Sequence, residues 1–134
     1  MVIGAFGETA FEVSNFKVLT FNNFKRETKA KFASHETIGQ PAKLEFLYNE
    51  LEEISFILTF HKGLGVNPEE EIKKLREMCK IGEADFLIIG DAPYGENEWV
   101  IESISESADV WDGNGKIYSS KVDVKLKEYI READ

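Results

Sequence analysis

The stretch Leu64-Gly65-Val66-Asn67-Pro68-Glu69-Glu70-Glu71, continuing to Gly82, has the features of one helix with both ends specified. Asn67 is a favourable N-cap because its side-chain oxygen can accept a hydrogen bond from a free backbone amide of the first turn. Pro68 then falls at the first helical position, where a missing N–H has no cost, and Gly82 is placed to end the helix. We therefore predict a helix over about Pro68–Ile81. Its apolar stripe consists of Ile72, Leu75, Met78 and Cys79.

Most of the remaining chain has the patterns of β-strands. The run Ile54–Phe60 alternates apolar and polar residues with period two, which is typical of a strand with one buried face. The run Asp85–Gly90 is almost continuously apolar, and we expect a strand buried on both faces. Two long strands, Trp99–Val110 and Lys116–Ile130, are joined by Asp112-Gly113-Asn114-Gly115, whose residues favour a tight reversal. The sequence predicts an α+β, mainly β fold in one domain, residues 1–134.

A polar segment from Phe24 to Ile38 has only weak alternation and ends at Gly39-Gln40-Pro41. A strand this polar would rarely stand unsupported in a regular domain, so we predict an arm or long hairpin that finds its partner on another molecule. A further short strand is expected over Lys43–Leu47. The residues expected at a subunit interface are Phe24, Arg26, Lys29, Lys31, Phe32 and His35.

Composition excludes several classes of protein. The net charge of −9 argues against a protein that grips nucleic acid, which needs a basic surface. No segment approaches the roughly 18 apolar residues that span a bilayer. Residues 1–6 lack the basic lead of a signal peptide. The single cysteine, Cys79, cannot form an internal disulfide, and its place on the apolar stripe favours a core position.

The patterns of common catalytic and metal sites are missing from the sequence. It contains neither a phosphate-binding glycine loop nor a nucleophile elbow. His35 and His61 have no partner at metal-ligand spacing. Glu102 and Glu106 would lie about 13 Å apart on one strand face, too far to act on one bond. We expect no enzyme, no cofactor and no catalytic or metal-binding residue.

Several short stretches resemble the phage tail protein U family of contractile-tailed phages, in the same order and over nearly the whole chain. They are Met1–Gly7, Leu44–Leu47, Glu53–Phe56, Leu64–Pro68, Ile88–Gly90, Trp99–Ser103 and Val124–Ile130.

The resemblance implies a structural protein of a contractile tail or of a tailocin, with a tail-tube-like β-sandwich or partial barrel and one flanking helix. It implies a ring, hexameric by analogy with tail-tube proteins, in the tail tube near the baseplate. The implied partners are the tube, the tape measure and the baseplate hub or a LysM-type protein, with no specific nucleic-acid or membrane partner. Assembly would take place in the host bacterial cytoplasm. The alternatives are a terminator ring at the head-proximal end and a monomeric adaptor or chaperone of tail assembly.

A ring on the tube axis also needs a face that lines the channel. A basic lining would hold DNA, and an apolar lining would invite aggregation before assembly. On the strand Trp99–Val110 two faces alternate, one with Glu102 and Glu106 and one with Ser103, Ser105 and Ser107. We predict that Glu102 and Glu106 face the lumen and that the serine face packs between layers.

Overall fold

The computed structural model describes residues 2–7, 9–13, 18–19, 21–90 and 92–131. Strands make up most of this part of the chain. In chain order the elements are β1 (Val2–Phe6), β2 (Thr9–Val13), β3 (Val18–Leu19), β4 (Phe21–Glu27), β5 (Ala30–Thr37), β6 (Gln40–Asn49), β7 (Glu53–His61), η1 (Lys62–Leu64), α1 (Pro68–Ile81), β8 (Leu87–Ile89), β9 (Ala92–Pro93), β10 (Glu98–Trp111) and β11 (Ile117–Tyr129).

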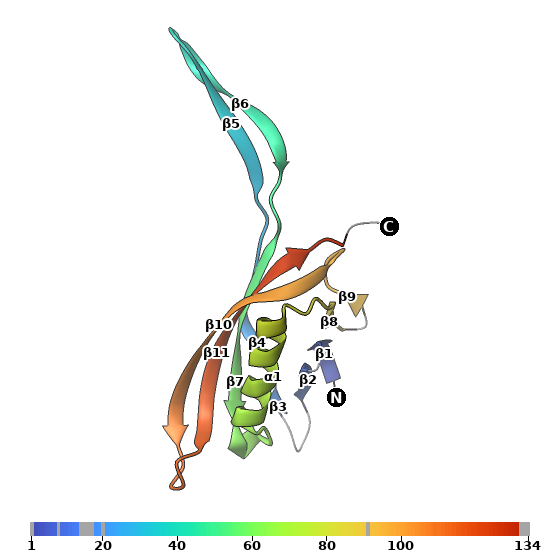
Figure 1. Cartoon of the computed structure of the whole chain (residues 1–134), viewed down its shortest axis with the longest axis vertical. Coiled ribbons are helices and arrows are strands. Elements are labelled where there is room, and N and C mark those ends of the chain that lie inside the picture. The colour runs from blue at the N-terminus through green and yellow to red at the C-terminus, as the bar shows by residue number, and fades with distance from the viewer. Residues whose placement is uncertain (1, 8, 14–17, 20, 91, 132–134) are drawn as a thin grey trace.

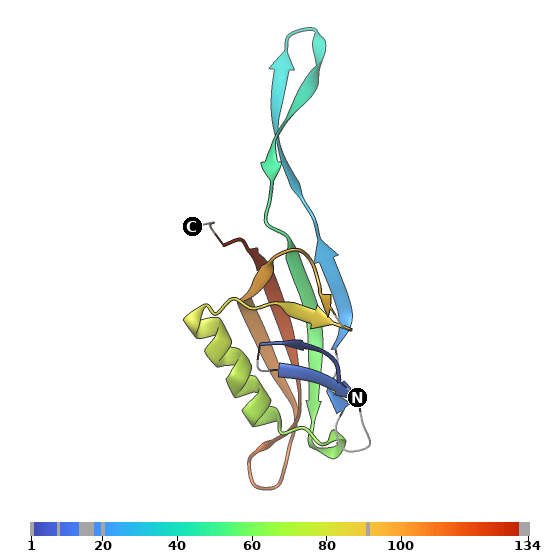
Figure 2. The same cartoon turned by 90° about the vertical axis from the view of Figure 1, so that its right-hand side faces the viewer.

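The strands form three antiparallel sheets (Figure 1). The central sheet has four strands in the order β10-β11-β7-β4, and a second sheet has five short strands in the order β3-β2-β1-β8-β9. Strands β5 and β6 pair only with each other. Helix α1 and the five-stranded sheet lie on the same side of the four-stranded sheet (Figure 2). The predicted mainly β fold with one flanking helix is confirmed, and the described strands do not close into a barrel.

The hydrophobic core lies between the four-stranded sheet and the layer formed by α1 and the five-stranded sheet. Strand β7 alternates as predicted, with Ile54, Phe56, Leu58 and Phe60 buried. Strand β11 lies beside it and contributes a matching buried row in register, namely Val122, Val124 and Leu126. Each buried aliphatic or aromatic side chain contributes roughly 1.5–3 kcal/mol, so these two strands supply a large part of the stabilisation.

Helix α1 begins and ends where the sequence predicts. Leu75 is 2% exposed on its buried face, and Gly82 takes a left-handed conformation with φ of 66°. The Gly82 amide donates to the Cys79 carbonyl and the Glu83 amide donates to the Met78 carbonyl, both at 3.3 Å, which is the bond pattern of a Schellman motif. The expected side-chain cap is wrong: Asn67 is at the N-cap, but its side chain makes no capping hydrogen bond.

The C-terminal hairpin also follows the prediction, with one difference. The Asp112 carboxylate accepts the amides of Asn114 at 2.8 Å and Lys116 at 3.0 Å, which closes the turn. In β10 the pairing register shifts between Ile101 and Ser103. The extra residue of this bulge re-aims the side chains that follow it, so Ile101 and Ile104 both pack toward the core although strict alternation would separate them.

The prediction that the run Asp85–Gly90 is buried on both faces is wrong. Leu87 is 1% exposed, but Phe86 and Ile88 are 41% and 37% exposed. A run of apolar residues does not reveal how many layers cover a strand, and the described structure packs β8 against the core on one face only.

Candidate assembly surfaces

Strands β5 and β6 form a hairpin that projects from the rest of the molecule along its longest axis (Figure 1). We call this hairpin, residues 30–49, the arm. Gly39, with φ of 79°, lies in the turn where the sequence predicts a break. The predicted hairpin is present, but its bounds differ from the prediction. Residues 24–27 belong to β4 in the four-stranded sheet, and β5 pairs with β6 of its own chain. Strand β6 includes the run Lys43–Leu47 that the sequence indicates as a separate strand.

The two faces of the arm differ in character. Phe32 lies directly opposite Phe46, and the next pair on the same face is Ser34 with Leu44. The rings of Phe32 and Phe46 meet edge to face at 5.7 Å, yet Phe46 remains 54% exposed and Leu44 69% exposed. An isolated two-stranded hairpin is marginally stable in water, so this apolar face is suited to being covered by a partner.

The opposite face of the arm is polar. His35 lies across from Lys43 in the register, and its Nε2 atom is 2.6 Å from a carboxylate oxygen of Glu45. All three side chains are exposed. The arm is therefore an amphipathic ribbon.

A polar network holds the root of the arm to the body. The Glu52 carboxylate accepts from Arg26 Nε at 2.9 Å and from the Thr28 hydroxyl at 3.1 Å, and this acceptor raises the pKa of the Arg26 guanidinium. The Glu52 amide donates to Glu128 at 3.2 Å, and Glu128 also accepts from the Asn97 side chain at 2.8 Å. These bonds join β4, the connection between β6 and β7, and β11 at the point where the arm leaves the sheet, so they anchor the base of the arm to the body.

The six residues predicted at an interface do not form one cluster. Phe24 stacks on Phe56 within the body, with ring centroids 6.1 Å apart, and Arg26 belongs to the root network. Lys29 pairs with Glu27 at 2.8 Å in the connection to the arm. Lys31, Phe32 and His35 lie on the arm and are exposed. Their contact with another subunit stays a prediction.

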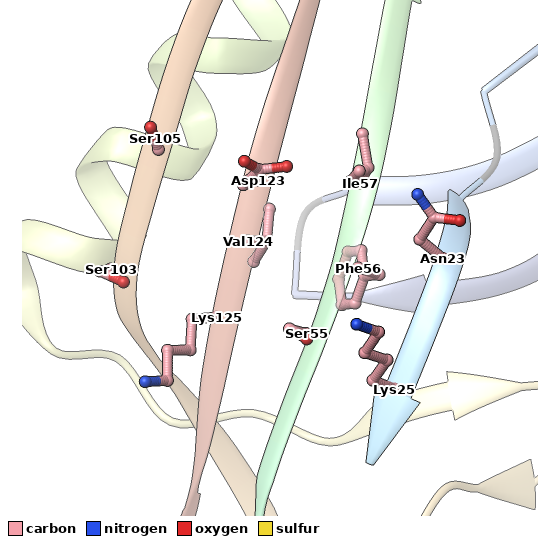
Figure 3. A pocket seen from close by; sticks show the side chains of 10 residues that line it. All are labelled: Asn23, Lys25, Ser55, Phe56, Ile57, Ser103, Ser105, Asp123, Val124 and Lys125. Atoms are coloured by element: carbon pink, nitrogen blue, oxygen red, sulfur yellow. The ribbon is translucent and has the colours of Figure 1, made fainter. Parts of the chain in front are cut away.

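The four-stranded sheet has a second, uncovered face, which we call the open face. A shallow hollow of about 590 Å³ lies on it. Figure 3 shows Ser103, Lys125, Ser55 and Lys25 side by side on the four successive strands. The expectation that the serine face packs between layers is wrong for the layers of this chain, because Ser103, Ser105 and Ser107 are exposed. The bulge at Glu102 and the packing of α1 on the other side of the sheet determine which face of β10 is exposed. Neither can be read from the alternation of the sequence.

The two glutamates predicted to face a lumen do not share an environment. Glu106 lies on the helix side of the sheet, where its Oε2 accepts from Arg76 Nε at 2.8 Å. This contact raises the pKa of the Arg76 guanidinium. Glu102 is exposed at the bulge of β10. Their place relative to a channel stays a prediction, since it depends on how subunits are arranged.

The two histidines and the cysteine lie on three different elements. His35 lies on the arm, while His61 Nδ1 accepts the Gly63 amide at 2.9 Å in the body. Cys79 is a free, half-buried thiol on α1. The described residues include no group of three or more His, Cys, Asp or Glu placed to hold a metal ion. They also include no helix with both the length and the apolar character to cross a bilayer.

Sequence reasoning missed the apolar face of the arm, which consists of Phe32, Leu44 and Phe46. A signal for it was present. Two strand-forming runs separated by a short segment with glycine are typical of a hairpin, and Leu44 and Phe46 of the second run are two positions apart, as residues on one strand face are. The pairing of the two strands places Phe32, Leu44 and Phe46 on one face.

Comparison with known proteins bears on this architecture. A search of curated proteins gave no match to the sequence. The family model described as Phage P2 GpU matches residues 7–131. This range includes the arm, the helix and the C-terminal hairpin, and it confirms the resemblance to the tail protein U family. The chain therefore belongs to the Phage P2 GpU family and has a phage tail-related role in structure or assembly.

Proposed function

We propose that this protein forms a ring, of six copies, that is part of the tail tube near the baseplate of a contractile phage tail or tailocin. Its work in this proposal is structural and needs no catalysis or cofactor. It would assemble in the host cytoplasm and contact the tube, the tape measure and the baseplate hub.

The arm is the observation that carries the proposal. It extends beyond the body with Phe46 and Leu44 exposed on one face, and it is anchored at its root by the Glu52 network. Exposed apolar side chains on a projecting, anchored ribbon have a cost in solubility, which assembly with a neighbour removes. A monomeric protein would gain little from such a ribbon.

The edges of the four-stranded sheet support the same conclusion. Strand β10 at one edge and β4 at the other have no neighbouring strand on their outer side in the described part of the chain. Open sheet edges promote aggregation of a monomeric protein, and closure of the sheets into a ring removes these edges. In such a ring β10 of one copy would lie beside β4 of the next, a head-to-tail arrangement that closes by rotation.

Mass measurement of the purified chain, alone and with its tube protein, tests the ring. We expect a sixfold multiple of the 15.2 kDa chain in at least one of the two samples. Phe46→Asp should reduce this species strongly, because it places a charge on the apolar face of the arm. The matched control Ala33→Asp places the same charge on the opposite face and should assemble like the parent.

A map of the assembled particle gives the decisive result. A ring of six copies around the tube axis at the baseplate end would agree with the proposal. The same ring at the head end would identify a terminator, and particles that lack the protein would identify an assembly factor. Either result would overturn the proposed location.

A further inference from the structure

The arm joins the body through two connections that are not part of either strand ladder. The first consists of residues 28–29 and the second of residues 50–52. A backbone hydrogen bond from the Glu50 amide to the Lys29 carbonyl, 3.0 Å long, links them. Because the second connection is one residue longer than the first, the ladder is interrupted there, and such an interruption bends a strand pair. The pairing of strands therefore does not determine the direction of the arm.

Side-chain packing at the two connections is sparse. Hollows of about 440 Å³ and 320 Å³ lie beside them. Lys127 lines the first hollow and Glu128 the second, and neighbouring residues of a strand point to opposite faces, so the hollows flank the connections. Leu51, in the second connection, is 43% exposed. In both views the arm stands clear of the body (Figures 1 and 2), which leaves room for it to pivot.

The root network joins these connections to the body, and Glu52 is its centre. The Glu52 Oε2 atom accepts from Arg26 Nε at 2.9 Å and from Nη2 of the same guanidinium. Its Oε1 atom accepts from the Thr28 hydroxyl at 3.1 Å. The Glu52 amide donates to the Glu128 carboxylate at 3.2 Å, and the Glu52 carbonyl accepts the Glu128 amide at 2.9 Å. One residue of the second connection thus bonds to the first connection, to β4 and to β11.

The guanidinium that binds Glu52 is itself held by the body. Arg26 lies over the ring of Tyr94, 5.2 Å from its centroid, in an attractive cation–π contact. The Tyr94 ring meets Phe24 edge to face at 5.2 Å, and the Tyr94 carbonyl accepts from the Trp99 indole at 3.0 Å. Trp99 is 1% exposed. A series of contacts therefore runs from the core to the Glu52 carboxylate.

We propose that Glu52 is the positioning residue of the arm, and that it holds the arm in one direction in the single chain before any partner binds. This inference goes beyond the proposed function, because the direction of the arm is a property of one chain. A segment that is already held in its bound direction loses less conformational freedom on association. If the ring forms as proposed, Glu52 therefore also favours its assembly.

Distances between two spin labels test the proposal in the full chain. All chains carry Cys79→Ser, with one label at Ala33→Cys on the arm and the other at Ser107→Cys on the open face, both exposed positions. An excess of unlabelled chain keeps labelled chains apart. We expect one narrow distribution of distances in the parent and a several-fold broader distribution in Glu52→Ala.

Glu50→Ala is the matched control, because Glu50 lies in the same connection and bonds through its backbone amide, which alanine keeps. This variant should retain the narrow distribution. Both variants should unfold at a temperature close to that of the parent, since partly exposed ion pairs contribute little to global stability. A broad distribution in the parent, or equal widths in Glu52→Ala and Glu50→Ala, would overturn the proposal.

A second pair of variants decides the question if Glu52→Ala does not fold. Glu52→Gln keeps the shape of the side chain but removes the charge that holds the guanidinium, and charge-assisted hydrogen bonds are the stronger ones. Its distribution should be broader than that of Glu50→Gln. Equal widths in these two variants would overturn the proposal in the same way.

The positioning of the arm and the ring can fail separately. Glu52→Ala should lower the yield of the sixfold species, because its arm is no longer held in one direction. A broadened distribution in Glu52→Ala, with no sixfold species in any sample of the parent, would support the role of Glu52 and overturn the proposed ring. A sixfold species in the parent, with equal widths in Glu52→Ala and Glu50→Ala, would support the ring and overturn the role of Glu52.

Discussion

Ser120 has a hydroxyl buried in the core without a hydrogen-bond partner among the described residues. It is 1% exposed and lies opposite Phe60 in the sheet. An unpaired buried hydroxyl costs stability because its hydration is lost and not replaced. Ser120→Ala should therefore raise the free energy of unfolding by about 1 kcal/mol, measured by urea denaturation. Ser107→Ala, on the open face, is the control and should have little effect; a clear loss of stability in Ser120→Ala would contradict this reading.

Asp112 determines the closure of the C-terminal hairpin. The amides of Lys116 and Asn114, with the ammonium of Lys62, lower the pKa of the Asp112 carboxyl. A carboxyl with a lowered pKa stabilises the fold fully above its unfolded pKa of about 3.9, and the stabilisation is lost as the pH falls through the lower folded pKa. The difference in unfolding free energy between the parent and Asp112→Ala should therefore be present at neutral pH and disappear in acid. Asp112→Asn keeps an acceptor that does not titrate, so its difference from Asp112→Ala should persist in acid. A parent-to-alanine difference that is independent of pH would contradict the assignment.

At the scale of the element, helix α1 depends on the face that it buries. Leu75→Asp would place an unpaired charge among core side chains, which costs several kcal/mol. Lys73→Asp introduces the same residue on the exposed face and should change the free energy of unfolding by less than about 1 kcal/mol. Thermal unfolding of the two variants compares them directly. If Leu75→Asp unfolds at the same temperature as the parent, the buried face of α1 has been assigned wrongly.

The arm should differ from the other elements in its response to assembly. Its backbone bonds join only two strands, so we expect fast amide exchange over residues 30–49 in the isolated chain. Assembly should slow this exchange, because a neighbour would cover the apolar face. The buried strand β7 serves as an internal control and should be protected in both states. Equal exchange of the arm before and after assembly would contradict its proposed role in a ring.

At the scale of the whole molecule, two surfaces are candidates to line the channel of the proposed ring. The open face has serine hydroxyls with mixed charges, while Glu106 is paired with Arg76 on the helix side. We expect that lysine at both Ser103 and Ser105 leaves the ring intact but slows passage of DNA, since added lysines bind phosphates. The pair Glu102→Lys and Glu106→Lys tests the alternative that the sequence favours. Genome or cargo delivery by assembled particles is the readout, with ring mass as the control. Impairment only by the glutamate pair would assign the lumen to that side.

Local chemistry was predictable from the sequence wherever a few neighbouring residues decide it. The bounds of α1, the buried alternation of β7 and the turn at Asp112 are examples, because proline at the first helical position, glycine after the last, side-chain period and turn preference act over short distances. The arm was predictable as an irregular feature from its polarity. Its apolar face was not, because the pairing of Phe32 with Phe46 joins residues on separate strands.

What only the tertiary structure decided is which faces are covered. The exposure of Phe86 and Ile88, the bulge that brings Ile101 and Ile104 to one side, and the contact of Arg76 with Glu106 all depend on elements distant in the chain. A hydrophobic pattern indicates that a side chain favours burial. The packing of the layers determines which element buries it. By itself the sequence determined α1, the long strands, the acidic balance and the resemblance to a tail protein family. The packing of α1 and the five-stranded sheet on one side of the four-stranded sheet decided the surfaces left for assembly.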